Sequence, residues 1–164
     1  MSVSTALTVC IQDHYQEASL PEPALWEKWF QQWVDDLAEE LPSAEAYELT
    51  LCLSDNAEIE ALNSQYRQKD QPTDVLAFAN LETPFPREVA LLATGEPLYL
   101  GDIIVSVETA KQQAVENKHS LTQELAWLAT HGLLHLLGWD HPDENRLETM
   151  LARQHTLLVM SGHK

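Results

Sequence analysis

The stretch from Leu121 to Leu137 constrains the fold of this chain most strongly, because it joins clear helix boundaries to a nearly continuous apolar sequence. Ser120 and Gln123 have the spacing of a capping box, which begins a helix. Gly138 follows the last apolar residues, in the C′ position where helices commonly end with glycine. A helix with so few polar side chains must pack against other elements over most of its surface. The sequence therefore predicts a central apolar helix over residues 121–137.

The remaining segments alternate between strand-like and helix-like patterns. The expected strands cover residues 4–12, 48–53, 75–79 and 101–106. Of the expected helices, one follows Pro23, one ends at Lys118, and the others cover 57–66, 121–137 and 144–159. The prolines and glycine of residues 80–98 predict a loop. With no repeat or linker, these elements indicate a single domain over residues 1–164 of the α+β (mixed α/β) class, with about five helices packed on a sheet of about four strands.

Two further sets of residues are interpreted as parts of the hydrophobic core. The first is an aromatic stripe at helical spacing, formed by Trp26, Trp29, Phe30, Trp33, Val34 and Leu37. Such a stripe could stack nucleobases, but at this spacing core packing is more typical. The second set is the only two cysteines, Cys10 and Cys52, which lie in apolar stretches without a CxxC spacing. We interpret both as small buried hydrophobic side chains.

The net charge is −17, from 26 acidic and 9 basic residues, and it argues against sequence-independent attraction to polyanions. Residues 1–60 hold 13 acidic residues and one basic residue, and therefore −12 of the total. A site for an anion is expected in residues 61–164, which carry −5. The chain has no apolar run long enough for a membrane span and no secretory signal, so we expect a cytoplasmic protein with no membrane partner.

Three of the seven histidines fall within the segment that ends the central helix. His131 and His135 are four residues apart, so on a helix both rings lie on one face, where their nitrogens can meet at one ion. Gly138 lets the chain turn back, and His141 can then supply a third nitrogen. Three imidazoles with one open position are typical of a catalytic zinc site, although imidazole also suits other divalent transition metals. The alternative is that these histidines are ordinary hydrogen-bonded residues of an apolar helix.

Other polar residues near or outside this cluster have less specific signals. Asp140 could orient a ligand or a water molecule, or it could cap the turn, and both interpretations stay open. Four more histidines lack ligand spacing and are predicted to be surface or locally hydrogen-bonded residues: His14, His119, His155 and His163.

The spacing of the histidine cluster matches the H-E-x-x-H-x-x-G-x-x-H pattern of zinc proteases, including the glycine at Gly138. In those proteases the glutamate after the first histidine is the general base for peptide hydrolysis. Here that position is Gly132, which can neither bind a metal nor transfer a proton. The candidate ligands are therefore present without the proteolytic base, which argues against a peptide substrate.

The segment His131–His141, with the sequence HGLLHLLGWDH, resembles the H-G-x-L-H-L-x-G-[YW]-D-H signature of the bacterial YbeY family. Residues 62–78 (LNSQYRQKDQPTDVLAF) are similar to the family's L-N-x-x-Y-R-x-x-D-x-P-T-D-V-L-S-F run, and residues 100–103 (LGDI) to its L-G-D-I strand. The resemblance covers roughly residues 47–160 and leaves residues 1–46 unmatched. The sequence departs from the family pattern at Ala77, where serine is usual, and at Trp139, where tyrosine is commoner.

The resemblance implies a single-strand-specific, metal-dependent endoribonuclease of late ribosomal RNA processing (16S rRNA 3′-end maturation) and ribosome quality control. It implies one Zn²⁺ ion held by His131, His135 and His141, and no nucleotide cofactor. The implied partners are ribosomal RNA, the small ribosomal subunit and ribosome-assembly proteins.

Arg67 and His131 are the candidate catalytic residues, with the planar guanidinium of Arg67 as the cation beside the phosphate. The residues alone favour a surface ion pair of Arg67 with Asp70 or Asp74, and the resemblance to the family reverses that preference. Two other functions stay open. One is a metallohydrolase of another substrate class, and the other is a ribosome-assembly RNA-binding factor with a structural zinc.

Overall fold

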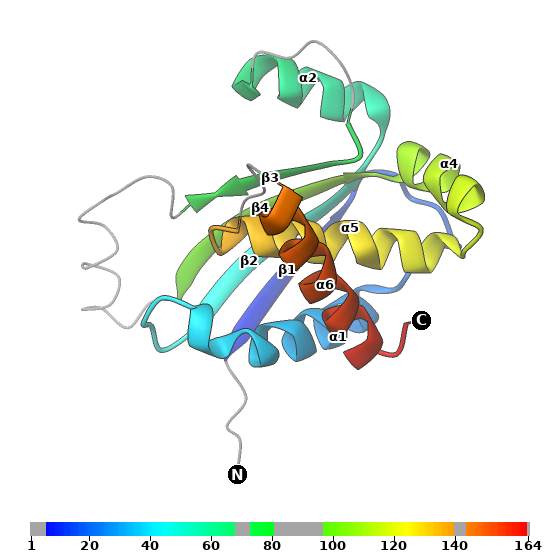
Figure 1. Cartoon of the computed structure of the whole chain (residues 1–164). Helices are drawn as coiled ribbons and strands as arrows, with labels where there is room; N and C mark the ends of the chain where they lie inside the picture. Colours follow the sequence, from blue (N-terminus) through cyan, green and yellow to red (C-terminus); the bar gives the residue numbers. More distant parts are fainter. Residues whose placement is uncertain (1–5, 68–72, 81–96, 140–143, 164) are drawn as a thin grey trace.

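The computed structural model describes residues 6–67, 73–80, 97–139 and 144–163, and its centre is a four-stranded sheet. The strands are β1 (Leu7–Asp13), β2 (Tyr47–Ser54), β3 (Val75–Ala79) and β4 (Leu98–Ser106). They lie in the order β1-β2-β4-β3, with β1, β2 and β4 parallel and β3 antiparallel. Helices lie on both faces of the sheet (Figure 1). This arrangement confirms the predicted mixed α+β class.

Five α-helices and one short 3-10 helix surround the sheet in the described ranges. They are α1 (Pro23–Asp36), η1 (Ala38–Glu40), α2 (Asn56–Arg67), α4 (Val107–Asn117), α5 (Leu121–Leu136) and α6 (Glu144–Met160). Helix α2 lies on one face of the sheet, and α1, α5 and α6 lie on the other (Figure 1). Of these described helices, none combines the length and the hydropathy that crossing a membrane requires.

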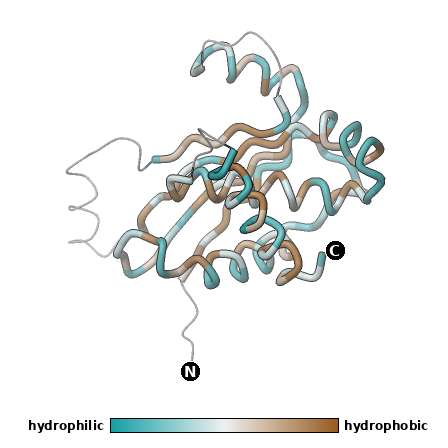
Figure 2. Tube along the Cα trace, viewed as in Figure 1, coloured by the Kyte–Doolittle hydropathy of each residue, from teal (hydrophilic) through white to brown (hydrophobic). Residues whose placement is uncertain are grey.

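Alternate side chains of the strands enter two separate apolar clusters, one on each face of the sheet. The larger cluster joins Leu51 of β2 and Ile103 of β4 to buried residues of α1, α5 and α6. The smaller cluster lies between the sheet and α2, and its buried members are Cys52, Ile59, Leu76 and Ile104. Figure 2 shows hydrophobic residues along the strands and hydrophobic and hydrophilic residues alternating along the helices.

The aromatic stripe of α1 is part of the core, as predicted. Trp26, Phe30 and Trp33 are completely buried in the larger cluster. The indole nitrogen of Trp33 donates hydrogen bonds to the backbone carbonyl of Leu157 (3.1 Å) and to Oγ of Ser161 (3.0 Å). This side chain therefore links α1 to the end of α6, and the stripe is not free to stack nucleobases.

The two cysteines differ in exposure. Cys52 is buried, as predicted, whereas the prediction for Cys10 is wrong, because Cys10 is exposed. Cys10 lies on the same face of the sheet as Cys52, since its neighbours Val9 and Ile11 enter the larger cluster on the opposite face. Helix α2 packs on β3 and β4 rather than on the edge strand β1, so it leaves Cys10 uncovered.

Helix α5 begins and ends as its sequence predicts. The side chain of Ser120 accepts a hydrogen bond from the backbone nitrogen of Gln123 (3.1 Å). At the other end Gly138 has a φ of +96°, and Trp139 closes the turn with a backbone hydrogen bond to Leu134 (2.9 Å). The left-handed glycine therefore ends the helix just after the two histidines.

Strand β4 begins at Leu98 rather than at the predicted residue 101, because its first residues continue the pairing with β2. Between Tyr99 and Gly101 one residue of β4 is left out of the register, which is a β-bulge. Gly101 has a φ of +143°, and a Cβ at this position would collide with the carbonyl oxygen of Phe78 in β3. Glycine is therefore required where the bulge brings β4 close to β3.

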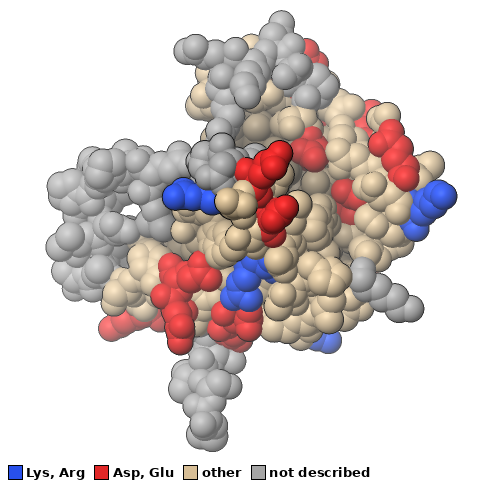
Figure 3. All heavy atoms as spheres, in the orientation of Figure 1, with Lys and Arg blue, Asp and Glu red and all other residues tan. Residues whose placement is uncertain are grey.

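Charged residues of the acidic N-terminal segment lie at the surface. Asp36, Glu39 and Glu40 are exposed where α1 passes into η1. Figure 3 shows acidic side chains gathered over this region and over the start of α6. Arg153 of α6 forms an ion pair with Asp36 (2.7 Å). Most of this negative charge therefore faces solvent.

Candidate metal centre

Helix α5 carries His131 and His135 on one side, as their spacing predicts. Their Nε2 atoms lie 3.0 Å apart, and the two rings are nearly perpendicular, with centroids 4.5 Å apart and an interplanar angle of 77°. Both residues are partly exposed, whereas Gly132, Leu133 and Leu134 between them are buried. The helix therefore presents two imidazole nitrogens to one accessible point.

Gln154 of α6 is completely buried, and its side chain determines which ring nitrogen of His131 carries the proton. Its amide nitrogen donates to the backbone carbonyl of Trp127 (3.3 Å), because a carbonyl oxygen can only accept. The amide oxygen then faces Nδ1 of His131 at 3.1 Å, so this ring nitrogen must be the donor. A neutral imidazole with its proton on Nδ1 keeps a lone pair on Nε2. The atom of His131 that faces His135 can therefore bind a cation.

The spacing and donor chemistry of this pair fit a transition-metal ion. With zinc–nitrogen distances of about 2.0–2.1 Å in a tetrahedral site, two imidazole nitrogens are separated by about 3.4 Å. The separation in this protein is 3.0 Å, which is close to that value. The contact between Gln154 and His131 is also the kind of outer hydrogen bond that orients a ligating histidine.

Three of the predicted site residues are not placed beside this pair. His141 and Asp140 lie outside the described residues. Arg67 is the last residue of α2, but its side chain also lies outside what the structure describes. The third ligand and the catalytic cation therefore stay predictions.

Gly132 faces the sheet rather than the histidine pair. A Cβ at this position would lie 2.6 Å from Cγ2 of Ile103 and 3.2 Å from its Cγ1. Contacts this short force one of the two partners to move in a closely packed interior. Helix α5 therefore packs against β4 through this glycine, and no room exists for the glutamate that zinc proteases carry there.

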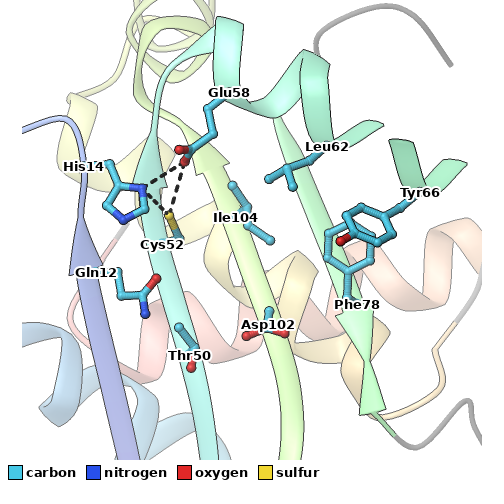
Figure 4. Close-up of a pocket in the computed structure, with 10 residues that line it drawn as sticks. All are labelled: Gln12, His14, Thr50, Cys52, Glu58, Leu62, Tyr66, Phe78, Asp102 and Ile104. Atoms are coloured by element: carbon cyan, nitrogen blue, oxygen red, sulfur yellow. Dashed lines mark hydrogen bonds and ion pairs between the residues drawn. The ribbon is translucent and has the colours of Figure 1, made fainter. Parts of the chain in front are cut away.

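A second group of metal-binding residue types lies on the opposite face of the sheet (Figure 4). His14 follows β1, Cys52 lies in β2, and Glu58 lies in the first turn of α2. Nδ1 of His14 is 2.9 Å from Oε1 of Glu58 and 3.4 Å from Sγ of Cys52, and Sγ is 3.7 Å from Oε1. His14 is exposed, as predicted, but its partners come from two other elements.

Burial raises the pKa of the Cys52 thiol to about 12, and the negative charge of Glu58 acts in the same direction. The pKa of Glu58 is lowered, chiefly because Ser54 and then His14 hydrogen-bond to its carboxylate. Oγ of Ser54 donates to Oε1 of Glu58 at 2.5 Å. In the absence of a metal, the group therefore holds a carboxylate beside a protonated thiol.

His119 and His155 behave as their lack of ligand spacing predicts, whereas the prediction for His163 is wrong, because its ring packs on α1 and its Nε2 is buried without a hydrogen-bond partner among the described residues. His119 lies 2.6 Å from the buried carboxylate of Glu124. His163 packs edge-on against Trp29, with ring centroids 4.7 Å apart, and burial lowers the pKa of His163. His155 is exposed on α6.

Two features of these sites have little signal in the sequence. Gln154 is separated from His131 by 23 positions. The sequence hints at its role only because Gln154 is a polar residue on the otherwise apolar side of α6. His14, Cys52 and Glu58 come from three different elements, so no local spacing relates them. Both features arise only when the helices dock on the sheet.

Comparisons with known proteins agree with the fold and the motifs. The family model for Endoribonuclease YbeY matches residues 10–162. A protein from Picosynechococcus sp. with this name is 62% identical over 141 residues, which cover 85% of this chain and 85% of that protein. A protein of the same name from Cyanothece sp. is 52% identical over 157 residues, which cover 94% of this chain and 92% of that protein.

The solution structure of TM1509 from Thermotoga maritima has the same fold, with a TM-score of 0.57 and 24% identity over 94% of this chain and 89% of that chain. The family match begins at residue 10. It therefore includes most of the segment 1–46 that the motif resemblance leaves unmatched. Because the family model matches residues 10–162 and a named relative is 62% identical, the chain belongs to the YbeY family.

Proposed function

We propose that this chain is a metal-dependent endoribonuclease that cleaves single-stranded RNA. The observation that carries the proposal is the pair of Nε2 atoms of His131 and His135, which lie 3.0 Å apart at a partly exposed position on α5. The relatives named Endoribonuclease YbeY supply the substrate class. In this proposal His141 is the third ligand, and the ion is zinc or another divalent transition metal that imidazole binds.

The described residues account for how the ion would be held. Gln154 keeps the proton of His131 on Nδ1, so the lone pair of Nε2 faces His135, whose Nε2 lies 3.0 Å away. For ligation His135 must likewise carry its proton on Nδ1, because a protonated Nε2 cannot bind a metal. When bound, such an ion polarises a phosphoryl oxygen and lowers the pKa of water. In this proposal His131 is therefore a catalytic residue because it is a ligand of the ion.

Arg67 is the second catalytic residue of the proposal. Its planar guanidinium can donate two hydrogen bonds to phosphoryl oxygens, where negative charge develops in the transition state. Two described basic side chains are engaged elsewhere, because Arg153 pairs with Asp36 and Lys111 pairs with Glu17, each at 2.7 Å.

The proposal extends to the cellular substrate and partners. The order of the three YbeY-like segments, at residues 62–78, 100–103 and 131–141, supports ribosomal RNA as the substrate, in late processing at the 3′ end of 16S rRNA and in ribosome quality control. The small ribosomal subunit and ribosome-assembly proteins are the partners in this proposal, and the cytoplasm is the compartment. A net charge of −17 argues for weak, salt-sensitive binding of free RNA, so partners would supply much of the selectivity.

Metal analysis combined with RNA cleavage tests the proposal in the purified full chain. We expect His135→Ala to lose one equivalent of metal and cleavage together. Arg67→Ala should keep its metal and lose about 100-fold to 1,000-fold in cleavage rate, as expected when one charge-stabilising group is removed. His155→Ala is the matched control, because it removes an exposed histidine of α6 and should keep both metal and activity.

Cleavage by His135→Ala, or by protein stripped of metal with a chelator, would contradict the proposal. Equal cleavage of a single-stranded oligonucleotide and of its duplex would contradict the single-strand preference alone. All variants are purified in the same way, so an inert His135→Ala also excludes a contaminating ribonuclease.

A further inference from the structure

The group of His14, Cys52 and Glu58 lies outside the site on α5 (Figure 4). Its three donor atoms form a triangle with sides of 2.9, 3.4 and 3.7 Å. Tetrahedral zinc, with ligand distances of about 2.0–2.3 Å, separates nitrogen, sulfur and oxygen ligands by about 3.3–3.6 Å. The triangle therefore has the size of one face of a zinc coordination sphere.

We propose that His14, Cys52 and Glu58 bind a second transition-metal ion, of the zinc class, independently of the site on α5. Imidazole nitrogen, thiolate sulfur and carboxylate oxygen are all ligands that zinc takes in proteins. The sheet separates the two sites, because α2 and the histidine-bearing α5 pack on opposite faces (Figure 1). The two ions therefore share no ligand.

Charge around the group favours a cation. Asp13 and Asp102 add negative charge at the Cys52 thiol, and Glu58 is in direct contact with it. None of the described residues that line the adjoining pocket is a lysine or an arginine. These carboxylates disfavour an isolated thiolate, but they stabilise a thiolate that is bound to a dication.

The ligands are held in place by contacts that metal binding would leave intact. The backbone nitrogen of His14 donates to the carbonyl of Leu53 at 2.8 Å. The side chain of Asp55 accepts from the backbone nitrogen of Glu58 at 2.8 Å and so fixes the first turn of α2. Cys52 lies within β2, between the paired strands β1 and β4. Little reorganisation is therefore needed for the three donors to converge.

Binding exchanges a proton for the ion. The S–H bond of Cys52 breaks, a sulfur–metal bond forms, and one proton passes to solvent, with no change in the oxidation state of sulfur. Nδ1 of His14 donates to Glu58 in the metal-free protein, so a neutral His14 ring must also move its proton from Nδ1 to Nε2 through solvent before Nδ1 binds the ion. Three protein ligands leave one coordination position open. The three residues themselves line a pocket of about 530 Å³ whose other walls include Leu62, Phe78 and Ile104, so a small molecule could reach the ion.

Titration of the metal-free full chain with cobalt(II) tests the proposal, because a thiolate ligand gives a charge-transfer absorption in the near ultraviolet. We expect this absorption in the wild-type protein, with saturation at one equivalent for the sulfur site and loss when zinc is added. It should be absent in Cys52→Ser and in His14→Ala. Cys10→Ser is the matched control, since it removes the exposed cysteine and should keep the absorption.

No absorption in the folded wild-type protein, or an absorption that persists in Cys52→Ser, would overturn the proposal. His14 is exposed, so His14→Ala leaves the core intact, and circular dichroism shows whether Cys52→Ser is folded. His135→Ala should keep the absorption although it lacks the site on α5. Because the readout needs no RNA cleavage, failure here and failure of the endoribonuclease proposal are distinguishable.

Discussion

Nδ1 of His131 lies 3.1 Å from the side-chain oxygen of Gln154, a buried residue on a different helix. This contact makes α6 part of the candidate metal centre, because it decides which nitrogen of His131 carries the proton. Without it, the ring could also carry its proton on Nε2, and in that form His131 could not share an ion with His135.

We therefore expect Gln154→Leu to weaken metal binding at the α5 site by about 10-fold to 100-fold, the usual cost of losing such an outer contact. Gln154→Glu keeps an acceptor oxygen opposite Nδ1 and should bind more tightly than Gln154→Leu. Competition with a chromophoric chelator measures the affinities, in a Cys52→Ser background that leaves only the α5 site. Wild-type affinity in Gln154→Leu would show that the contact does not orient His131.

Gly132→Ala should destabilise the fold, because the added Cβ would lie 2.6 Å from Ile103. Overpacking of this kind costs about 1–3 kcal/mol, and the better helix propensity of alanine offsets about 1 kcal/mol of it. Denaturant unfolding measures the net loss. The loss should shrink in an Ile103→Ala background, where the clashing methyl is gone.

Gly138→Ala is the control for the Gly132→Ala and Ile103→Ala variants, since nothing lies within 4 Å of a Cβ at position 138. Its cost comes from the φ of +96° alone and should be the same with or without Ile103. If the cost of Gly132→Ala did not shrink in the Ile103→Ala background, the packing of α5 against β4 through this glycine would be wrong.

In metal-free protein, iodoacetamide should modify Cys10 well before Cys52. Cys10 is exposed, whereas Cys52 is buried and its thiol has a pKa of about 12. At pH 8 roughly one Cys52 thiol in ten thousand would be the reactive thiolate. Peptide mapping by mass spectrometry gives the two rates, and denatured protein, in which both cysteines should react, is the control. Similar rates in the folded protein would contradict the burial of Cys52.

Glu58 should contribute to the pH dependence of stability in acid. Its pKa is lowered from the value of 4.5 by hydrogen bonds from Ser54 and His14. The stabilisation is therefore present above about pH 4.5 and is lost as the pH falls through the folded-state pKa. We expect the melting temperature of metal-free Glu58→Gln to fall less steeply below pH 4.5 than that of the wild type. The difference should be small, because the carboxylate is partly exposed. Parallel melting curves would show that the lowered pKa has no effect on folding.

The elements that local chemistry defines could be predicted from the sequence. Helix α5 follows from its capping residues Ser120 and Gln123 and from Gly138, all within the segment itself. The pairing of His131 with His135 follows from the period of the helix, which needs no knowledge of the rest of the fold.

Features that depend on how elements dock could not be predicted in this way. The bulge before Gly101 depends on the register between β4 and β2, which the sequence of β4 alone does not determine. Strand alternation places Cys10 and Cys52 on one face, but the position of α2 decides that only Cys52 is covered. The contacts of Gln154 and of His14 likewise cross between elements.

The contact between Gly132 and Ile103 also limits which side chains position 132 of this chain can carry. The pattern of this chain differs from that of the zinc proteases at one essential position, yet a glutamate there would push α5 off the sheet. A glutamate at position 132 would therefore also require a shorter side chain at position 103. At least two substitutions, rather than one, therefore separate the two histidine patterns on this scaffold.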